Sequence, residues 1–450
     1  MKNFLILYPI FLILFFKCTS EEPQPGNSDS EKTEKIFDGD VILLTQEEVD
    51  DFGNDHYTKI TGKLIIGPSD SSTNSITNIS KLNYLNSVGK DLVVHNNNLL
   101  SSLEGLQNCN SIGSHLLIDN NSSLENVEDL SNITHLLSLN ISSNTNLKNL
   151  KGLDNVTQID EDLGLYFNHS LRNLNELSSI KIIGGSLIIS SNILLESIGA
   201  LSNIKSLENL SIWNNDLLAD LDGLSNLEII NGSLVINHNE SLTDISALNK
   251  VVSIGYGLII ASNILLEELS GLENVASIGQ NIEISSNPSL KNIDGLMNLH
   301  SIGQGILLNN NYELQNINGF TNLSEINGML EIYQCFNLSN INGFNNVMEI
   351  TGGAWIYHNS SLENIDGFNN LTSVGGDLRI FSNDILTNLN GLANLNSVWL
   401  DLQVSGNSDM NDLCGLQGLL INEGLRGYFG VYGNGFDPTK QDIIDGNCSQ

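Results

Sequence analysis

Basic residues and long hydrophobic runs are scarce in this chain of 450 residues. Lysine and arginine number 18 against 52 aspartates and glutamates, which gives a formal net charge of −34. Such a surface repels nucleic-acid phosphates and anionic lipid headgroups, so the charge argues against nucleic acid as a partner. Divalent cations, basic protein surfaces and neutral ligands such as glycans remain compatible with it.

Catalytic and metal-binding motifs are absent as well. The sequence contains no HExxH, GxSxG, P-loop, CxxC or EF-hand pattern, and its eight histidines lack metal-ligand spacing. Polysaccharide-active enzymes built on β-helices need clustered carboxylates or basic residues on irregular loops, whereas the repeated segments described below keep a nearly constant length. We therefore predict that the protein is not an enzyme and uses no cofactor or metal, with a polysaccharide-active enzyme as the less favoured alternative.

The longest apolar run lies at the N-terminus, from Phe4 to Phe16. Its thirteen residues are too few to span a hydrocarbon core of about 30 Å, so residues 1–17 are predicted to be an export signal. The run is followed by Lys17, Cys18 and soon an acidic pair, which resembles the signals of bacterial surface lipoproteins of the Bacteroidetes group. The resemblance implies lipidation of Cys18, anchoring in the outer membrane and display at the cell surface. Because Lys17 departs from the small residue usual before such a cysteine, cleavage by an ordinary signal peptidase stays open.

An internal repeat of about 24 residues dominates the rest of the chain. Short apolar segments such as SLIISSN and SLVINHN recur at a nearly constant step, which is one position shorter in two places. The last residues of these segments are Asn97, Asn121, Asn144, Asn168, Asn192, Asn215, Asn239, Asn263, Asn287, Asn311, Cys335, Asn359, Asn383 and Asn407. A less regular segment, KLIIGPS, precedes them, which makes about fifteen turns. One turn cannot bury its apolar residues alone, so stacked turns share a continuous core.

Apolar residues recur at fixed offsets within a turn. One turn contains Leu187, Ile189, Leu195, Ile198, Leu201, Ile204 and Leu207. The first pair alternates as in a strand, and the later steps of three residues fit short extended segments joined by tight corners. Glycines beside the corners, such as Gly303 and Gly376, are expected to adopt positive φ angles.

The recurring asparagine is predicted to be structural. Its side-chain amide can satisfy backbone groups at a corner of its own turn and of the next turn, so the asparagines would form a buried ladder. Cys335 takes one position of the ladder, and Cys109 takes the place of a small core residue. We expect both cysteines to be buried thiols.

The segments IIGGSLIISSN, LENIDGF and NLTSVGG resemble the receptor L-domain of insulin-type and EGF-type receptors, and related repeats of bacterial surface lipoproteins. The resemblance covers about Val41 to Asn407. It implies an all-β solenoid, namely a right-handed parallel β-helix of about fifteen leucine-rich-repeat-like turns. It implies no particular ligand, and the chain lacks the cysteine-rich module, the kinase and the spanning helix of those receptors.

Both ends of the repeat are predicted to be capped. The expected parts are a flexible tether over residues 18–40, an N-terminal cap over 41–60, the solenoid over 61–408 and a C-terminal cap over 409–450. Thr45 and Glu48 have capping-box spacing, which indicates a short helix ahead of the first turn. In an oxidising compartment, Cys414 and Cys448 are expected to form a disulfide that closes the C-terminal cap.

The outward-facing residues of the strands depart from the repeat in one place. Most turns have small or polar residues in the second outward position, whereas three successive turns have aromatic ones, which we call the aromatic strip: Tyr333, Tyr357 and Phe381. The candidate ligand-binding residues are these three together with Trp355, His358 and Arg379, and Glu331 stands beside them. At a strand spacing of about 4.8 Å the rings are expected to stack and to form a flat surface. Two interpretations stay open, because the rings could stabilise an outer sheet or could recognise sugar rings or peptide side chains.

These patterns predict an exported, lipid-anchored surface protein that binds or adheres to a glycan or protein ligand without catalysis. The alternative is a passive envelope protein that coats the surface and has no specific ligand. A groove beside the aromatic strip would favour binding, and a cluster of close carboxylates would favour the enzyme.

Overall fold

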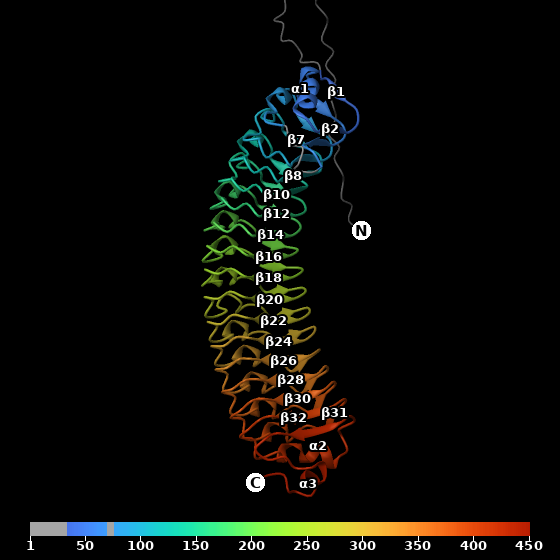
Figure 1. The fold of residues 1–450 in the computed structure, drawn as a ribbon, viewed down its shortest axis with the longest axis vertical. Coiled ribbons are helices and arrows are strands. Elements are labelled where there is room, and N and C mark those ends of the chain that lie inside the picture. Colours follow the sequence, from blue (N-terminus) through green and yellow to red (C-terminus); the bar gives the residue numbers. More distant parts are fainter. Residues whose placement is uncertain (1–33, 70–75) are drawn as a thin grey trace, which may run out of the picture. The chain divides into compact units, whose positions relative to one another are not determined.

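The computed structural model describes residues 34–69 and 76–450, and Lys35–Gln450 forms one compact unit. The predicted export signal, Cys18 and most of the predicted tether lie outside the described residues. Lys35–Gln450 is a parallel β-solenoid in which successive turns stack on one another, each with a long strand and, in most turns, a short strand (Figure 1).

Parallel strands in register form the main sheet. Its strands are β2 (Val41–Leu43), β4 (Leu64–Ile66), β6 (Leu92–His95), β8 (His115–Asp119), β10 (Ser138–Ser142), β12 (Leu163–Tyr166), β14 (Leu187–Ser190), β16 (Leu210–Trp213), β18 (Leu234–Asn237), β20 (Leu258–Ala261), β22 (Ile282–Ser285), β24 (Ile306–Asn309), β26 (Leu330–Tyr333), β28 (Ala354–Tyr357), β30 (Leu378–Phe381), β32 (Leu402–Ser405) and β33 (Phe429–Tyr432). Each strand pairs with the equivalent strand of the next turn. The predicted strand segments form β4 to β32, and β2 and β33 extend the sheet by one strand at each end.

Short strands form a second set, which is interrupted. They are β1 (Ile36–Phe37), β3 (Lys59–Ile60), β5 (Ser87–Val88), β7 (Ser111–Ile112), β9 (His135–Leu136), β11 (Gln158–Ile159), β13 (Ile182–Ile183), β15 (Ser206–Leu207), β17 (Ile229–Ile230), β19 (Ser253–Ile254), β21 (Ser277–Ile278), β23 (Ser301–Ile302), β25 (Glu325–Ile326), β27 (Glu349–Ile350), β29 (Ser373–Val374) and β31 (Ser397–Val398). They pair in four groups, from β1 to β7, from β9 to β13, from β15 to β23 and from β25 to β31.

Helical segments are short. Single 3-10 turns occur at η2 (Ser80–Leu82), η3 (Glu128–Leu130), η4 (Asn175–Leu177), η5 (Gly199–Leu201), η6 (Asp222–Leu224), η7 (Ser246–Leu248), η8 (Asp294–Leu296), η9 (Asn318–Phe320), η10 (Asn342–Phe344), η11 (Asp366–Phe368), η12 (Asn390–Leu392) and η13 (Cys414–Leu416). The α-helices are α1 (Gln46–Asn54), α2 (Gln417–Ile421) and α3 (Lys440–Ile444). Most repeats thus contain a single 3-10 turn and no α-helix. The α-helices lie only near the two ends of the described solenoid.

The N-terminal end differs from its prediction in position. The capping box of α1 is confirmed, because the Thr45 side chain accepts a hydrogen bond from the Glu48 N–H and the Glu48 side chain accepts one from the Thr45 N–H. However, β1 and β2 precede α1 and pair with β3 and β4, so the helix lies within the first turn. The strand β1 falls within the stretch predicted as tether, and Val41 and Leu43, at the start of the predicted cap, are buried and extend the core.

The C-terminal end also continues the repeat further than expected. The disulfide between Cys414 and Cys448 is present, as predicted. Between these cysteines, β33 adds a strand to the main sheet, with Leu402 opposite Phe429. The sequence pattern conceals this strand because Phe429 stands three positions later than the repeat would place it.

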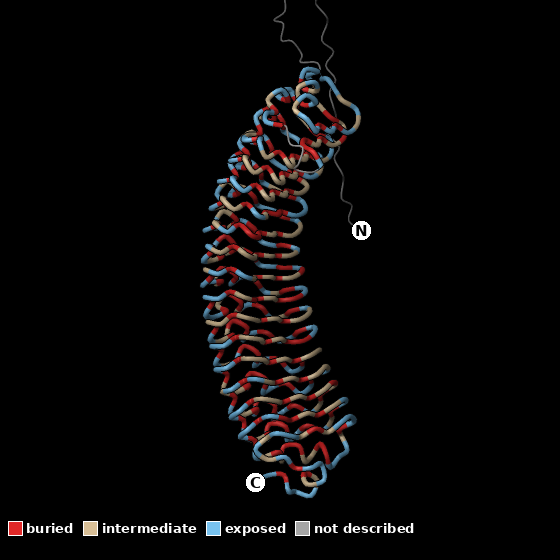
Figure 2. The backbone as a smooth tube through the Cα atoms, in the orientation of Figure 1, coloured by how far each residue is buried: buried red, intermediate tan, exposed pale blue. Residues whose placement is uncertain are grey.

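The core consists of apolar residues at the predicted offsets. In the turn that begins at Leu187, every residue of the predicted set is at most 1% exposed. The same inward pattern recurs in turn after turn (Figure 2). In three successive repeats the 3-10 turn (η9, η10 and η11) ends in a phenylalanine. These residues, Phe320, Phe344 and Phe368, stack within the core, with neighbouring ring centroids 5.5 and 6.1 Å apart.

The asparagines form the predicted buried ladder. Asn239 shows the arrangement: its backbone N–H donates to Oδ1 of Asn263 at 3.1 Å, and its Nδ2 donates to the Ile212 carbonyl at 3.0 Å. Cys335 continues the ladder, because its backbone N–H donates to Oδ1 of Asn359 at 3.0 Å. Each rung is fully buried and satisfies backbone groups that the corner would leave without partners.

A carboxylate ends this ladder near the C-terminus. Asn434 forms one further rung, because its Oδ1 accepts the Asn407 N–H at 3.1 Å. The Asp437 carboxylate then accepts hydrogen bonds from Nδ2 and the backbone N–H of Asn434 and from the Gly433 N–H. The last donors of the ladder are therefore satisfied without a further turn.

A second column of asparagines, the outer ladder, was not predicted. Each of its members donates a hydrogen bond from Nδ2 to a carbonyl of the preceding turn, as Asn226 does to Ser202 at 2.7 Å. The members are Asn108, Asn132, Asn155, Asn203, Asn226, Asn274, Asn298, Asn322, Asn346, Asn370 and Asn394. Asparagine therefore joins the turns at two positions, one inside the core and one near the surface.

The corner glycines have a different role from the predicted one. Gly303 and Gly376 do not adopt positive φ angles, but a Cβ at Gly303 would lie 1.8 Å from the Gly279 carbonyl oxygen. A Cβ at Gly376 would lie 2.6 Å from the Gly353 nitrogen. Positive φ occurs instead just before the ladder, for example at His358 with φ of 56°. The corners thus need glycine because neighbouring backbones approach closely there.

Candidate functional site

The aromatic strip stacks as predicted. Because β26, β28 and β30 pair in register, Tyr333, Tyr357 and Phe381 lie in one column. Both neighbouring pairs of rings have centroids 4.5 Å apart, with interplanar angles of 21° and 18°. All three side chains are half-buried.

The stack does not form the flat surface that the sequence suggested. Rings 4.5 Å apart and nearly parallel cover each other's faces, so both faces of Tyr357 are occupied by its two neighbours. What the middle ring exposes is its edge. Only the outer faces of Tyr333 and Phe381 remain outside the stack.

Glu331 fixes the middle ring. The Tyr357 hydroxyl donates a hydrogen bond to the Glu331 carboxylate on the preceding strand. Burial raises the pKa of Tyr357 above its ordinary value, and the hydrogen bond to Glu331 raises it further. The phenol therefore stays protonated and keeps its orientation over a wide pH range. Tyr333 has no such partner among the described residues, so its hydroxyl remains available to water or to a ligand.

Trp355 and Arg379 form a second layer beside the strip. The Arg379 guanidinium lies 4.8 Å from the Trp355 ring centroid and forms an ion pair with Asp377 at 2.7 Å. The Trp355 Nε1 and Arg379 Nε atoms are buried without hydrogen-bond partners in the described chain. A Cβ at Gly353 would lie 3.1 Å from Trp355 Nε1, so the indole folds back over its own strand. These two side chains are thus held by each other.

His358 joins the strip at the corner. Its ring centroid lies 5.8 to 5.9 Å from those of Tyr333, Tyr357 and Phe381, in edge-on orientations. The structure therefore brings together all six predicted ligand-binding residues.

A further aromatic pair extends this region and was missed by the sequence analysis. Tyr312 and Phe336 stack with centroids 5.1 Å apart and an interplanar angle of 9°, and they are 41% and 37% exposed. They directly follow the ladder residues Asn311 and Cys335 in successive turns. That shared position was the signal that would have revealed them.

The lesser aromatic residues of the same column lie elsewhere on the sheet. Tyr166 and Trp213 flank Ser190, which is 0% exposed although it points outward. A Cβ at Gly164 would lie 2.4 Å from the Tyr166 ring, so this ring rests on the glycine of its own strand. These contacts indicate a packing role for this pair.

Groups with catalytic potential are few in the described residues. Residues 34–69 and 76–450 contain no cluster of three or more histidine, cysteine or acidic side chains suited to a metal ion. His115 contacts two carboxylates, Asp91 at 3.0 Å and Glu161 at 3.6 Å, but its side chain is 50% exposed. Burial raises the pKa of Cys109 to about 11 and that of Cys335 to about 12, which leaves both thiols protonated and unreactive.

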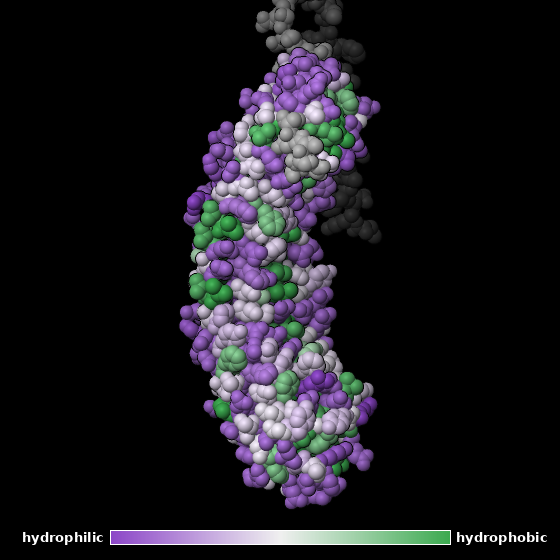
Figure 3. Space-filling view, viewed as in Figure 1, coloured by the Kyte–Doolittle hydropathy of each residue, from purple (hydrophilic) through white to green (hydrophobic). Residues whose placement is uncertain are grey.

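Three hollows lie away from the aromatic strip. Their volumes are about 400, 460 and 370 Å³, and outer-ladder asparagines line all of them. They lie beside the short strands, and no residue of the strip contributes to them. In the view of Figure 3, hydrophobic residues form separate small patches rather than one continuous area. Every helix in the described part of the chain is too short or too polar to cross a bilayer.

Comparisons with known proteins identify no family. No protein-family model matches the chain, and no curated protein matches its sequence. A similar solved structure is the crystal structure of a TLR13–ssRNA13 complex, which is 14% identical over 86% of this chain and 76% of that chain, with a TM-score of 0.23. A likeness of this size carries no information on the ligand or the site.

Proposed function

We propose that the protein is an exported, lipid-anchored binding protein whose main sheet recognises a ligand at the aromatic strip. The observation that carries the proposal is the run of three stacked, half-buried rings in a column that holds small or polar residues in most other turns. The solenoid itself needs no aromatic residue there, since most of the other turns stack without one. A rigid apolar surface with polar groups at its border is typical of recognition sites.

A protein surface is the partner that this geometry favours. Sugars are recognised on the open faces of aromatic rings, and the faces of Tyr357 are covered. The strip offers ring edges, the Tyr333 hydroxyl and the half-buried pair of Trp355 and Arg379. Tyrosine, tryptophan and arginine are the residue types that dominate binding energy in protein interfaces. The chain's negative charge further favours a partner with a basic surface.

The test compares the strip with the interior aromatic stack. Serine occupies the strip column in other turns, so Tyr333→Ser, Tyr357→Ser and Phe381→Ser should together preserve the fold. The matched control replaces the buried Phe320, Phe344 and Phe368 by leucine, the residue at that position in neighbouring turns.

Both variants and the wild type are screened against arrays of purified secreted proteins and of defined glycans. The proposal requires protein ligands whose Kd is at least about tenfold higher for the strip variant than for the wild type, which corresponds to about 1.4 kcal/mol. The interior variant should bind the same ligands as the wild type does. Ligands retained by the strip variant would refute the proposal. A wild type that binds nothing on either array would support the passive envelope protein instead.

The lipid anchor is proposed from the residues around Cys18 and has its own test. In a bacterial host, a Cys18→Ser variant should lose incorporation of a labelled fatty acid and should leave the membrane fraction. Persistence of both properties would mean that the chain is anchored in another way.

A further inference from the structure

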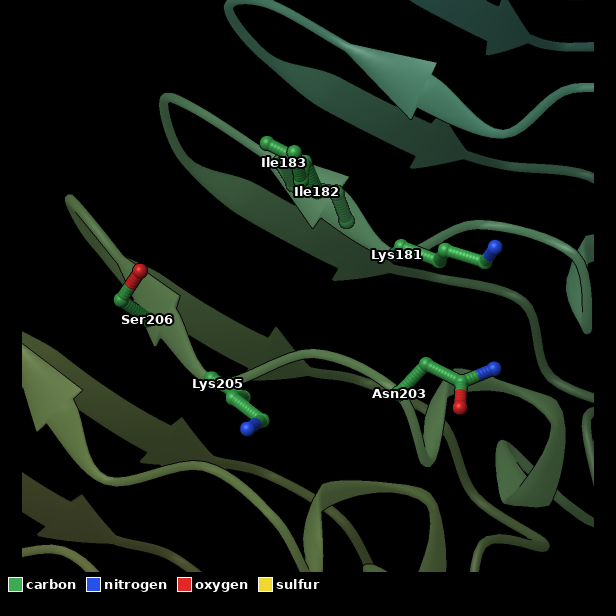
Figure 4. Close-up of a pocket in the computed structure, with 6 residues that line it drawn as sticks. All are labelled: Lys181, Ile182, Ile183, Asn203, Lys205 and Ser206. Atoms are coloured by element: carbon green, nitrogen blue, oxygen red, sulfur yellow. The ribbon is translucent and has the colours of Figure 1, made fainter.

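The face that carries the short strands contains an interruption that most turns lack. The short strands β13 and β15 belong to consecutive turns, yet they do not pair. At this interruption lies the hollow of about 400 Å³, lined by Lys181, Ile182, Ile183, Asn203, Lys205 and Ser206 (Figure 4). We call it the lysine hollow.

A shortened corner accounts for the interruption. Two residues separate Leu207 from Leu210, whereas three separate Ile183 from Leu187 in the turn before. The one other shortened corner among these repeats, between Leu136 and Leu139, also follows a short strand that does not pair with its predecessor, at the break between β7 and β9. A corner with one residue fewer shifts the short strand away from its neighbour, which opens the ladder.

The remaining break, between β23 and β25, has a different origin. Its corners have full length, and there the Asn327 side-chain amide donates a hydrogen bond to the Ile302 carbonyl at 3.1 Å. A side chain thus spans that break, whereas the break between β13 and β15 follows from chain length.

The opened ladder leaves a backbone donor in the hollow. In equivalent positions of turns whose short strands pair, this N–H bonds to the preceding turn, as Lys181 does to the Thr157 carbonyl at 2.9 Å and Glu228 to the Lys205 carbonyl at 2.8 Å. The Lys205 N–H has no hydrogen-bond partner in the described chain. An N–H that the fold does not satisfy requires water or a ligand.

The two lysines of the hollow are also without carboxylate partners. Elsewhere Lys148, Lys151 and Lys291 each contact a glutamate of a neighbouring turn, at 2.8, 2.6 and 2.6 Å. Within residues 34–69 and 76–450, no acidic side chain lies within ion-pair distance of Lys181 or Lys205. In a chain of net charge −34, two neighbouring lysines without partners form a local positive site.

We propose that the lysine hollow binds a carboxylate-bearing sugar residue of an acidic polysaccharide. The carboxylate would meet the two ammonium groups and the Lys205 N–H. The Ser206 hydroxyl and the Asn203 Oδ1 would bond to sugar hydroxyls, since the Asn203 Nδ2 already donates to the preceding turn. Ile182, which is 49% exposed, would contact the C–H face of the ring. A hollow of about 400 Å³ is within the range of pockets that hold small ligands.

The surroundings favour an acidic sugar over an acidic peptide or a nucleic acid. The strongly acidic surface around the hollow repels all three of these polyanions, so charge does not discriminate among them. Neutral amide and hydroxyl groups next to an exposed isoleucine are suited to the hydroxyls and C–H groups of a sugar. This site is independent of the aromatic strip, which lies on the long strands.

The experiment measures binding by the full chain with three probes of equal length, namely oligomers of galacturonic acid, of neutral galactose and of glutamic acid. The variants are Lys181→Ser with Lys205→Ser, and the matched control Lys90→Ser with Lys440→Ser, which removes the same charge from exposed positions elsewhere. We expect the galacturonate oligomer to bind the wild type and the control with similar affinity. Its Kd for the hollow variant should be at least about tenfold higher. The difference should shrink in 1 M salt, where the Debye length is about 3 Å.

A third variant tests the opened ladder while keeping both lysines. One glycine inserted after Leu207 restores a corner of full length, so β13 and β15 should pair and the hollow should close. We expect this variant to lose galacturonate binding and to unfold at a higher urea concentration than the wild type. Equal binding by all variants, or equal binding of the glutamate oligomer, would overturn the proposal.

Discussion

The buried asparagine ladder predicts a large loss of stability when one rung is truncated. In Asn239→Ala the Asn215 N–H loses its acceptor, which lies at 3.1 Å, and the Ile212 carbonyl loses its donor at 3.0 Å. Both groups are inside the core and cannot reach water. Each unsatisfied group costs about 1–3 kcal/mol, so the variant should lose about 2–6 kcal/mol.

The outer ladder provides the matched control. Asn226→Ala removes the hydrogen bond of 2.7 Å to the Ser202 carbonyl and the one that the Lys250 ammonium donates to Asn226 Oδ1, in the same part of the solenoid. Water can replace both bonds at the surface, so the loss should be about 0.5–1.5 kcal/mol. The two variants delete the same chemical group, one from the core and one from near the surface.

Urea unfolding followed by circular dichroism measures the free energy of unfolding of both variants. Because each turn of a solenoid contacts only its neighbours, amide hydrogen exchange should also quicken first in β16, β18 and β20, next to the altered rung. Losses below about 1 kcal/mol in both variants would refute the ladder as a source of stability. A larger loss for Asn226→Ala would show that the outer column contributes more than the buried one.

Three further predictions concern other single contacts. Cys335→Asn restores a side-chain acceptor for the backbone N–H of the preceding rung and should raise the free energy of unfolding by about 1 kcal/mol, whereas Cys335→Ala should lower it. Because the fold raises the pKa of Tyr357, the associated stability is present below its ordinary pKa of about 10 and declines as pH rises above it. Urea midpoints of the wild type should thus fall more steeply above pH 10 than those of Tyr357→Phe, which also loses the hydrogen bond to Glu331. Replacing Cys414 and Cys448, 34 residues apart, by serine should cost the C-terminal turns about 4 kcal/mol, detectable as a separate early transition in urea.

The repeat was predictable because each of its recurring residue types has a single physical role. Apolar residues at fixed offsets can only face a shared core, and an asparagine that recurs once per turn can serve neighbouring turns alike. The same logic failed at the ends. There α1 interrupts the first turn, and β1 carries the pattern over too few residues to be distinguished from a tether.

Geometry within a turn was less predictable than the turn itself. The glycines were recognised, but the sequence does not tell whether a glycine is required for a positive φ angle or for its lack of a Cβ atom. At Gly303 glycine is required because a Cβ atom would collide with the neighbouring backbone. The aromatic column was recognised as well, yet the tilt of its rings depends on side-chain torsions. That tilt decides whether Tyr357 presents a face or an edge, and so which ligands fit.

Both proposed sites occur where the equivalence of the turns is broken. In a regular solenoid every turn presents the same surface, so no position along the stack can be distinguished by a ligand. The aromatic strip breaks the equivalence by residue type, because three turns exchange small groups for Tyr333, Tyr357 and Phe381 without a change in length. At the lysine hollow the equivalence is broken by a difference in corner length, because a corner that is one residue shorter prevents β13 and β15 from pairing. A single glycine insertion should therefore remove the second site and leave the first unchanged, whereas serine substitutions in the strip should do the reverse.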